Sequence, residues 1–293
     1  MTIWKNYHLA TDVIGALQAL AGAAGQARLV AGGTDLLLDL QQGRHPPVST
    51  LVDITQIPEM RCLEVRQEWL YVGAALPLNH IVASPLVYQH ARALHEAAGL
   101  IGGPQVRNTA TLGGNVGHAL PAADGTIALL ALGAQAEVAN LDERRLIPVE
   151  ELFLGPGRST LNPRGELLVG FYLPLGRPGQ TSAFRRVMRP QGVAIAILNM
   201  AVWLDRQDDR IAEVRIAVGP AGPTPTRARG AETVLCGKAS NPQTISLGLE
   251  ALLKEAHFRT SPHRATAEYR RHLAGVLLED TLSAAWQRAA GED

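Results

Sequence analysis

The sequence predicts an α+β fold in two parts, a larger N-terminal domain followed by a smaller C-terminal one. The chain has 293 residues, 46% of them hydrophobic, which is more than a single core usually holds. The stretch 174–179, Pro-Leu-Gly-Arg-Pro-Gly, has the composition of a linker. Beyond it, strand-like runs come first and helical patterns follow, an order typical of an α+β domain.

The first unit, about residues 1–58, alternates helical and strand patterns. Val13, Leu17 and Leu20 form one apolar helical face, and Thr11 is the expected N-cap of that helix. After it we expect a strand at 28–31, a tight turn at Gly32-Gly33, a helical segment at 35–40 and a strand at 51–54.

The second unit, about residues 59–176, begins with a new strand pattern. Ser84 followed by Pro85 is a helix start, and that helix is expected to run towards Gly99. Residues 105–125 are rich in Gly, Asn and Thr and show no sustained periodicity, so a long loop is one interpretation. Strands are expected at 70–74, 135–139 and 167–173, and an apolar helix at 126–132.

The C-terminal domain is expected to span 180–290. Its strand-like runs are 182–188, 194–204 and 211–218. Three prolines then break the chain, and helical patterns occupy about 228–236, 243–257 and 265–290.

Charge and cysteine content exclude several classes of function. The chain has 27 basic and 27 acidic residues, so it offers no general attraction for nucleic acid or an anionic membrane. Cys62 and Cys236 stand alone, which predicts no metal site in this chain and favours a reducing, cytoplasmic location. No segment approaches the ~20 apolar residues of a membrane span. A Rossmann fingerprint, a P-loop and a G-x-S-x-G elbow are all missing.

Two glycine-rich turns are the strongest candidates for a binding site. In the first, residues 29–36 read Leu-Val-Ala-Gly-Gly-Thr-Asp-Leu, a strand leading through adjacent glycines into a helix. Such a turn exposes successive backbone N–H groups, which bind phosphate without a basic side chain. Thr34 adds a hydroxyl, and Asp35 is expected to cap the helix or meet a donor. An ordinary strand-to-helix turn is the structural alternative.

The second turn lies within residues 109–124. Its glycines allow close approach of the backbone to a ligand, and Thr111 and Asn115 supply neutral donors and acceptors. Asp124, at the start of a helix, is a candidate acceptor for ribose hydroxyls, with a plain N-cap as the alternative. Together the two turns suit a pyrophosphate held mainly by backbone dipoles.

These residues carry a resemblance. Ala31-Gly-Gly-Thr-Asp-Leu36 and Thr111-Leu-Gly-Gly-Asn115, followed by Pro121 and Asp124, resemble the FAD-binding medium subunit of the molybdenum hydroxylases, the family of xanthine dehydrogenase and carbon monoxide dehydrogenase. The resemblance covers nearly the whole chain. Later segments that fit the same family are 148–153, 161–174, 219–227 and 269–273.

The resemblance implies an FAD-binding domain of the vanillyl-alcohol-oxidase (PCMH) type with two subdomains, over residues 1–176, and a C-terminal flavoprotein domain. It implies FAD contacts along both turns and at four other positions, although Ile101 and Leu168 also suit a plain core. The full set is Leu29, Val30, Ala31, Gly32, Gly33, Thr34, Asp35, Leu36, Ile101, Thr111, Leu112, Gly113, Gly114, Asn115, Asp124, Leu168 and Arg185.

The function that the resemblance implies is electron transfer. FAD would lie in this chain, and the molybdenum cofactor and 2Fe-2S clusters on a large and a small partner subunit, in a dimer of heterotrimers. Residues 190–193 read Pro-Gln-Gly-Val, where relatives often have an acidic residue. A self-contained FAD-dependent reductase and a nucleotide-binding module without catalysis are the alternatives. A partner subunit would determine the substrate.

Overall fold

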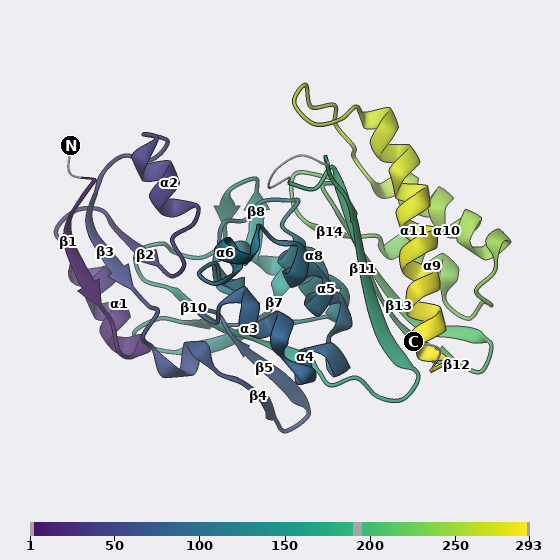
Figure 1. The fold of residues 1–293 in the computed structure, drawn as a ribbon, viewed down its shortest axis with the longest axis horizontal. Helices are drawn as coiled ribbons and strands as arrows, with labels where there is room; N and C mark the ends of the chain where they lie inside the picture. Colours follow the sequence, from purple (N-terminus) through teal and green to yellow (C-terminus); the bar gives the residue numbers. More distant parts are fainter. Residues whose placement is uncertain (1–2, 190–194, 292–293) are drawn as a thin grey trace.

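The structure, a computed structural model, describes residues 3–189 and 195–291. It has three parts arranged in a row, a small N-terminal lobe, a central lobe and a C-terminal domain (Figure 1). Residues 190–193 and the first residue of the strand expected at 194–204 lie outside the described residues.

The small lobe has a three-stranded parallel sheet in the order β1-β3-β2, with one helix after each of the first two strands. Among the described residues, the core on its α2 side has four buried members, Val30, Leu40, Val48 and Leu51, with Ile3, Trp4, Leu36 and Leu37 packed partly buried against them. The elements are β1 (Trp4–Leu9), α1 (Val13–Gly22), β2 (Ala27–Val30), α2 (Leu36–Gln41) and β3 (Val48–Asp53).

The central lobe has a five-stranded antiparallel sheet in the order β4-β5-β10-β6-β7. The strands are β4 (Leu63–Arg66), β5 (Trp69–Gly73), β6 (Gln135–Ala139), β7 (Arg144–Pro148) and β10 (Leu167–Pro174), with a separate pair, β8 (Phe153–Gly155) and β9 (Arg158–Ser159). The helices are α3 (Leu78–Ala83), α4 (Pro85–His90), α5 (Arg92–Leu100), α6 (Pro104–Arg107), α7 (Leu112–Gly117) and α8 (Asp124–Leu132), with 3-10 turns at Pro58–Arg61 and Val149–Leu152.

The C-terminal domain has a four-stranded antiparallel sheet in chain order, followed by three helices. Its elements are β11 (Gln180–Val187), β12 (Leu198–Gln207), β13 (Arg210–Gly219), β14 (Thr226–Arg227), α9 (Arg229–Leu235), α10 (Pro242–Glu255) and α11 (Ala267–Ala289).

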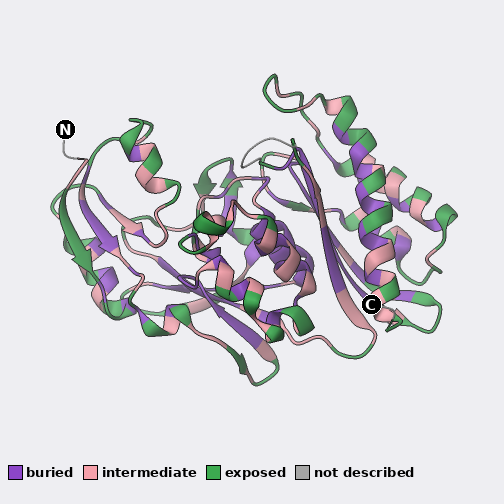
Figure 2. Cartoon of the chain, viewed as in Figure 1, coloured by how far each residue is buried: buried purple, intermediate pink, exposed green. Residues whose placement is uncertain are grey.

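The C-terminal sheet is buried on both faces, as Figure 2 shows. On β12, Met200, Val202 and Leu204 pack with the C-terminal helices, while the alternating Ala201 and Trp203 belong to the core of the central lobe. This period of two is what a strand between two apolar layers requires. Helices α5 and α8 cover one face and α11 packs on the other. The two domains therefore share one continuous apolar interface.

The structure corrects several expectations about the elements. Asp12, not Thr11, caps the first helix, because the helix begins at Val13 and the Asp12 Oδ1 accepts from the Gly15 N–H at 2.7 Å. The helix expected from Pro85 is two helices, α4 and α5, divided at Ala91, whose φ of −140° is not helical. Residues 105–125 contain α7 and most of α6 and do not form one long loop.

Candidate cofactor-binding site

The first glycine turn connects β2 to α2, as predicted. Gly33 has φ +66°, a left-handed conformation that glycine adopts without strain. The backbone N–H groups of residues 32–36 donate no hydrogen bond to any other described residue. Asp35 occupies the N-cap position of α2, but its side chain accepts no capping hydrogen bond. The turn thus presents a run of free backbone donors.

The two predicted motifs meet at Gly32. A Cβ at this position would lie 2.1 Å from the carbonyl oxygen of Thr109 and 2.8 Å from Cα of Ala110. Those two residues directly precede the second motif, so the turn of the small lobe rests on the backbone that leads into α7. Only glycine allows this approach. The sequence pattern placed both motifs in one site, and the fold brings them into contact.

The second motif is a short helix and is more deeply buried. Thr111 is the N-cap of α7, and its Oγ1 accepts from the Gly114 N–H at 3.0 Å. Gly113 packs so closely on Ala74, at the end of β5, that an added Cβ would lie 2.6 Å from the Ala74 carbonyl oxygen. The Gly113 N–H donates to that same oxygen at 2.9 Å. The helix is therefore fixed to the central sheet.

Asn115 is the polar side chain of α7 that lacks a partner. Its Oδ1 is buried and accepts no hydrogen bond from the described residues. This oxygen points at the start of α8, because a Cβ on Gly125 would lie 2.7 Å from it. A buried acceptor without a donor needs a partner from outside the described residues, such as a bound ligand or water.

Asp124 faces the C-terminal domain. It is the first residue of α8 and not its N-cap, which is Ala123. Its carboxylate pairs with Arg186 of β11 and accepts from Nδ2 of Asn199 at 2.6 Å. Burial raises the pKa of the Asp124 carboxyl, while Arg186 and Asn199 act to lower it. Arg186 and Asn199 therefore supply hydrogen-bond donors to the Asp124 carboxylate from within the protein. A contact of Asp124 with ribose hydroxyls stays a prediction.

Arg185 also takes part in an ion pair between the two domains. Its Nη1 lies 3.1 Å from Oε2 of Glu96 on α5, and Arg288 of α11 reaches Oε1 of the same glutamate at 2.5 Å. Glu96 also accepts from the Phe184 backbone N–H at 2.8 Å. Arg185 is therefore tied to α5 in this structure, and its contact with FAD stays a prediction.

Ile101 and Leu168 are apolar wall residues. Leu168 lies in β10 and is 7% exposed, and Ile101 caps α5 and packs partly buried against the same core. Leu29 and Val30 lie in β2, and Leu36 is the first residue of α2. These positions fit a plain hydrophobic core, and they also fit an apolar wall beside the flavin or the adenine.

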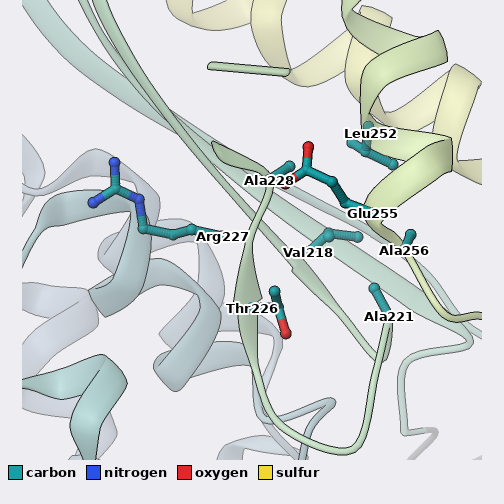
Figure 3. A pocket seen from close by; sticks show the side chains of 8 residues that line it. All are labelled: Val218, Ala221, Thr226, Arg227, Ala228, Leu252, Glu255 and Ala256. Carbon is teal, nitrogen blue, oxygen red and sulfur yellow. The ribbon is translucent and has the colours of Figure 1, made fainter. Parts of the chain in front are cut away.

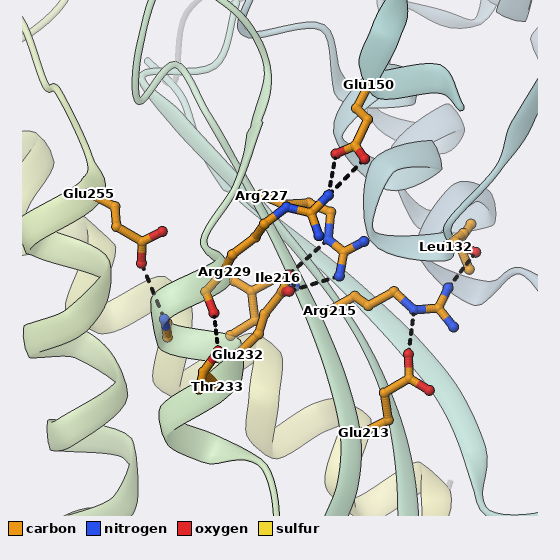
Figure 4. A network of polar contacts seen from close by, with 11 residues as sticks. Leu132, Glu150, Glu213, Arg215, Ile216, Arg227, Arg229, Glu232, Thr233 and Glu255 are labelled. Carbon is orange, nitrogen blue, oxygen red and sulfur yellow. Dashed lines mark hydrogen bonds and ion pairs between the residues drawn. The ribbon is translucent and has the colours of Figure 1, made fainter. Parts of the chain in front are cut away.

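Sequence reasoning missed the residues by which the C-terminal sheet holds α8. Arg186 and Asn199 bind its first residue, and Arg215 of β13 donates to the Leu132 carbonyl at its last turn, at 3.0 Å (Figure 4). An acid at a helix N-terminus and a cation at its C-terminus both suit the helix dipole. Strand alternation was an available signal for Arg186, since it shares a face with the buried Phe184.

Two small cavities lie away from the glycine turns. One, of about 10 Å³, lies between the end of β13, β14 and α10 (Figure 3). The other, of about 200 Å³, lies between the domains and is lined by Arg215, Arg227 and Glu150. Arg227 forms a hydrogen-bonded ion pair with Glu232, and Arg229 forms one with Glu150 (Figure 4). Among the described residues, no three His, Cys, Asp or Glu side chains are grouped to hold a metal, and no helix is long and apolar enough to cross a membrane.

Comparison with known families accounts for nearly the whole chain. Residues 4–176 match the FAD binding domain in molybdopterin dehydrogenase, and residues 182–285 match the CO dehydrogenase flavoprotein C-terminal domain. The chain belongs to the FAD-binding subunits of the molybdenum hydroxylase family. It is an oxidoreductase subunit whose FAD-binding domain has the predicted α+β architecture.

Individual relatives agree with this family. The xanthine dehydrogenase FAD-binding subunit of Escherichia coli O157:H7 is 31% identical, over 99% of this chain and 98% of the relative. The carbon monoxide dehydrogenase medium chain of Hydrogenophaga pseudoflava is 30% identical, over 97% and 98%. A solved carbon monoxide dehydrogenase from that organism superposes with a TM-score of 0.92, at 30% identity and the same coverage. Quinoline 2-oxidoreductase from Pseudomonas putida 86 superposes with a TM-score of 0.89, at 26% identity, over 97% of this chain and 98% of the matched one.

The site of the flavoprotein subunit fits FAD on its own geometry. The unpaired N–H groups of residues 32–36 suit a pyrophosphate, and the Gly32 contact leaves no room for a side chain between the two turns. The second motif also holds an unsatisfied acceptor, the Oδ1 of Asn115. These three observations lie in the two motifs that the sequence singled out.

Proposed function

We propose that this flavoprotein subunit transfers electrons within a molybdenum-containing hydroxylase or dehydrogenase complex. Electrons would pass from 2Fe-2S clusters of a small partner subunit, through FAD in this chain, to an external acceptor. The observation that carries the proposal is the contact of the two glycine turns, with free backbone donors on the first. The names of the relatives, a medium chain and an FAD-binding subunit, support an assembly with other chains.

Bound FAD would supply the redox chemistry, because it exchanges electrons singly or in pairs. The protein's part is binding and orientation. The N–H groups of residues 32–36 would hold the pyrophosphate, with Thr111 to Asn115 on the opposite side. Ile101 and Leu168 would give apolar contacts to the flavin and adenine, and Asp124 and Arg185 polar ones.

Assembly and location are further parts of the proposal. We propose a large subunit with the molybdenum cofactor and a small 2Fe-2S subunit, arranged as a dimer of heterotrimers. Cys62 and Cys236 are both free, which agrees with clusters held by another chain and with a cytoplasmic protein.

FAD binding is tested by substitution at the junction of the turns. Gly32→Val should lower the flavin content of the purified chain at least ten-fold, because its Cβ would overlap the Thr109 carbonyl. Gly22→Val in α1 is the matched control, since nothing lies within 4 Å of its added Cβ. Equal flavin content in the two variants would show that the contact at Gly32 is not part of the FAD site.

Electron transfer is tested in the assembled complex. Affinity purification of the chain from its native host should bring two partners, with molybdenum and iron, and substrate should bleach the flavin only when both are present. Reduction of the flavin by a small substrate in the isolated chain would instead favour the self-contained reductase. A colourless chain that takes up no FAD would contradict both.

A further inference from the structure

The loop that joins α10 to α11 carries only positive charge. Residues 256–266 contain Arg259, Arg264 and two histidines, with no Asp or Glu. Both arginines are exposed. In a chain whose 27 basic and 27 acidic residues balance, this excess is local. The loop stands at the N-terminal end of α11, at the top of the view in Figure 1.

Beneath this loop lies a buried arginine that the fold does not satisfy. Arg270, in the first turns of α11, is 1% exposed. Its Nε and Nη1 are buried, and among the described residues they find no hydrogen-bond acceptor and no carboxylate to form an ion pair. Burial lowers the pKa of Arg270, and repulsion by Arg264 and Arg259 lowers it further. A buried guanidinium with no acceptor is strongly unfavourable unless something outside the chain pairs with it.

Backbone contacts hold the loop next to Arg270. The Ser261 N–H donates to the Ala265 carbonyl at 2.9 Å, which closes the loop on itself. The Ala267 N–H donates to Oγ1 of Thr260 at 3.0 Å, which ties the loop to the start of the helix. The Arg270 N–H continues the helix from the Thr266 carbonyl at 3.2 Å. The loop that carries Arg259 and Arg264 is therefore held at the N-terminal end of α11, next to the turn that carries Arg270, and it supplies no counter-charge.

We propose that Arg259, Arg264 and Arg270 form an oxyanion-binding site in the C-terminal domain. The ligand is a phosphate or carboxylate group that accepts hydrogen bonds from Nε and Nη1 of Arg270. The two exposed arginines neutralise its remaining negative charge. Guanidinium forks match the paired oxygens of such groups. Because the chain covers both nitrogens, the loop has to shift as the anion enters. The group would come from a free ion or from a carboxylate of a partner subunit.

The first test uses the full-length purified chain and inorganic phosphate. Phosphate at constant ionic strength, compared with chloride, should raise the unfolding temperature saturably, by roughly 2 °C at ten times its dissociation constant. It should also slow tryptic cleavage after Arg259 and Arg264. Arg271→Met, on the exposed neighbour of Arg270, should keep both effects, and Arg270→Met should lose both.

The same variants distinguish a ligand site from a purely structural arginine. In chloride, Arg270→Met should unfold no earlier than wild type, because it removes an unpaired buried charge. A phosphate shift equal in Arg270→Met and wild type would overturn the proposal. If Arg270→Met does not fold, the exposed double variant Arg259→Ser/Arg264→Ser replaces it and should weaken phosphate binding at least five-fold, an unchanged affinity counting against the site.

The assembled complex identifies the source of the group. If a partner carboxylate fills the site, phosphate should stabilise the isolated chain and not the complex, and Arg270→Met should weaken assembly. If a free ion fills it, both forms should respond to phosphate alike. Absence of an Arg270-dependent response in both forms would exclude the site.

Discussion

The two glycine turns of the flavoprotein subunit have similar sequences but very different support. The first lies on the small lobe, where the core beneath α2 has four buried residues and the turn is half-exposed. The second begins α7, whose Leu112 is fully buried in the large core and whose Gly113 is bonded to Ala74. One turn is an open set of donors, and the other is part of a packed wall.

This difference suggests a division of labour in binding. A wall held by the central sheet and by α8 provides a fixed reference, and the small lobe closes its turn onto it at Gly32. Regions with few buried contacts open at low free energy, while packed regions open only with global unfolding. The small lobe is thus the part expected to adjust when a ligand enters.

The largest expected effect is on the support of the second turn. Arg186→Met should lower the free energy of unfolding by about 3–5 kcal/mol, because it leaves the buried Asp124 without its cation. Arg185→Met is the control, with an expected loss below about 1 kcal/mol because its side chain is 39% exposed and Glu96 keeps Arg288. Chemical denaturation measures both, and equal losses would show that α8 is not held through Asp124.

The pH dependence of the Arg186→Met loss follows from the direction of the Asp124 shift. Burial already raises the pKa of this carboxyl, and loss of Arg186 raises it further. A raised pKa favours the folded state at low pH and less so as pH rises through it. The loss caused by the substitution should therefore shrink from pH 8 to pH 5, and a constant loss would contradict this role of Asp124.

Gly113→Ala is expected to have the next largest effect. Its Cβ would lie 2.6 Å from the backbone of Ala74, so we expect a loss of about 1–3 kcal/mol. Gly117→Ala in the same helix meets nothing within 4 Å and should stabilise α7 by up to about 1 kcal/mol. Opposite signs in thermal unfolding would confirm that contact with the sheet, and not helix propensity, decides the glycine at 113.

The N-cap residues of α7 and α2 test the same difference in support between the two glycine turns. Thr111→Ala removes the cap of α7 and should lower the free energy of unfolding by about 1 kcal/mol, while Thr111→Ser should not. Asp35→Ala at the N-cap of α2 should change it by less than about 0.5 kcal/mol, since that side chain caps nothing. A large stability loss in Asp35→Ala would mean that the first turn is as tightly held as the second.

The smallest expected effect is local to the small lobe. The hydrogen bond from the Tyr7 hydroxyl to Asp53 raises the pKa of Tyr7 to about 12, from the ordinary 10.0. The link between β1 and β3 is present below pH 10 and is lost as pH rises through about 12. Asp53→Asn should bring the phenol titration, followed by ultraviolet absorbance, back towards 10.0, and an unchanged titration would exclude Asp53 as the cause.

Local patterns predicted most strands and helices and the two motifs, because apolar periodicity and glycine turns are visible in sequence. The strand β1 was missed, since Trp4–Leu9 mixes polar and apolar residues without regular alternation and is largely exposed. Helix α7 was missed because Leu-Gly-Gly-Asn-Val-Gly has weak helix propensity, and the Thr111 cap and the Ala74 contact are what hold it. The partners of Asp124 lie 62 and 75 residues away, beyond any local signal.

Because the C-terminal sheet is buried on both faces, it limits where the chain can be cut into fragments or recombined. The linker after Pro174 separates the domains in sequence, but in space β11 to β13 form one wall of the compartment around α8. A fragment ending at residue 176 would expose α8, whose nine residues are all buried. In a chimera between two relatives, α8 and the strands that cover it should be exchanged together, so the practical unit of recombination crosses the domain boundary.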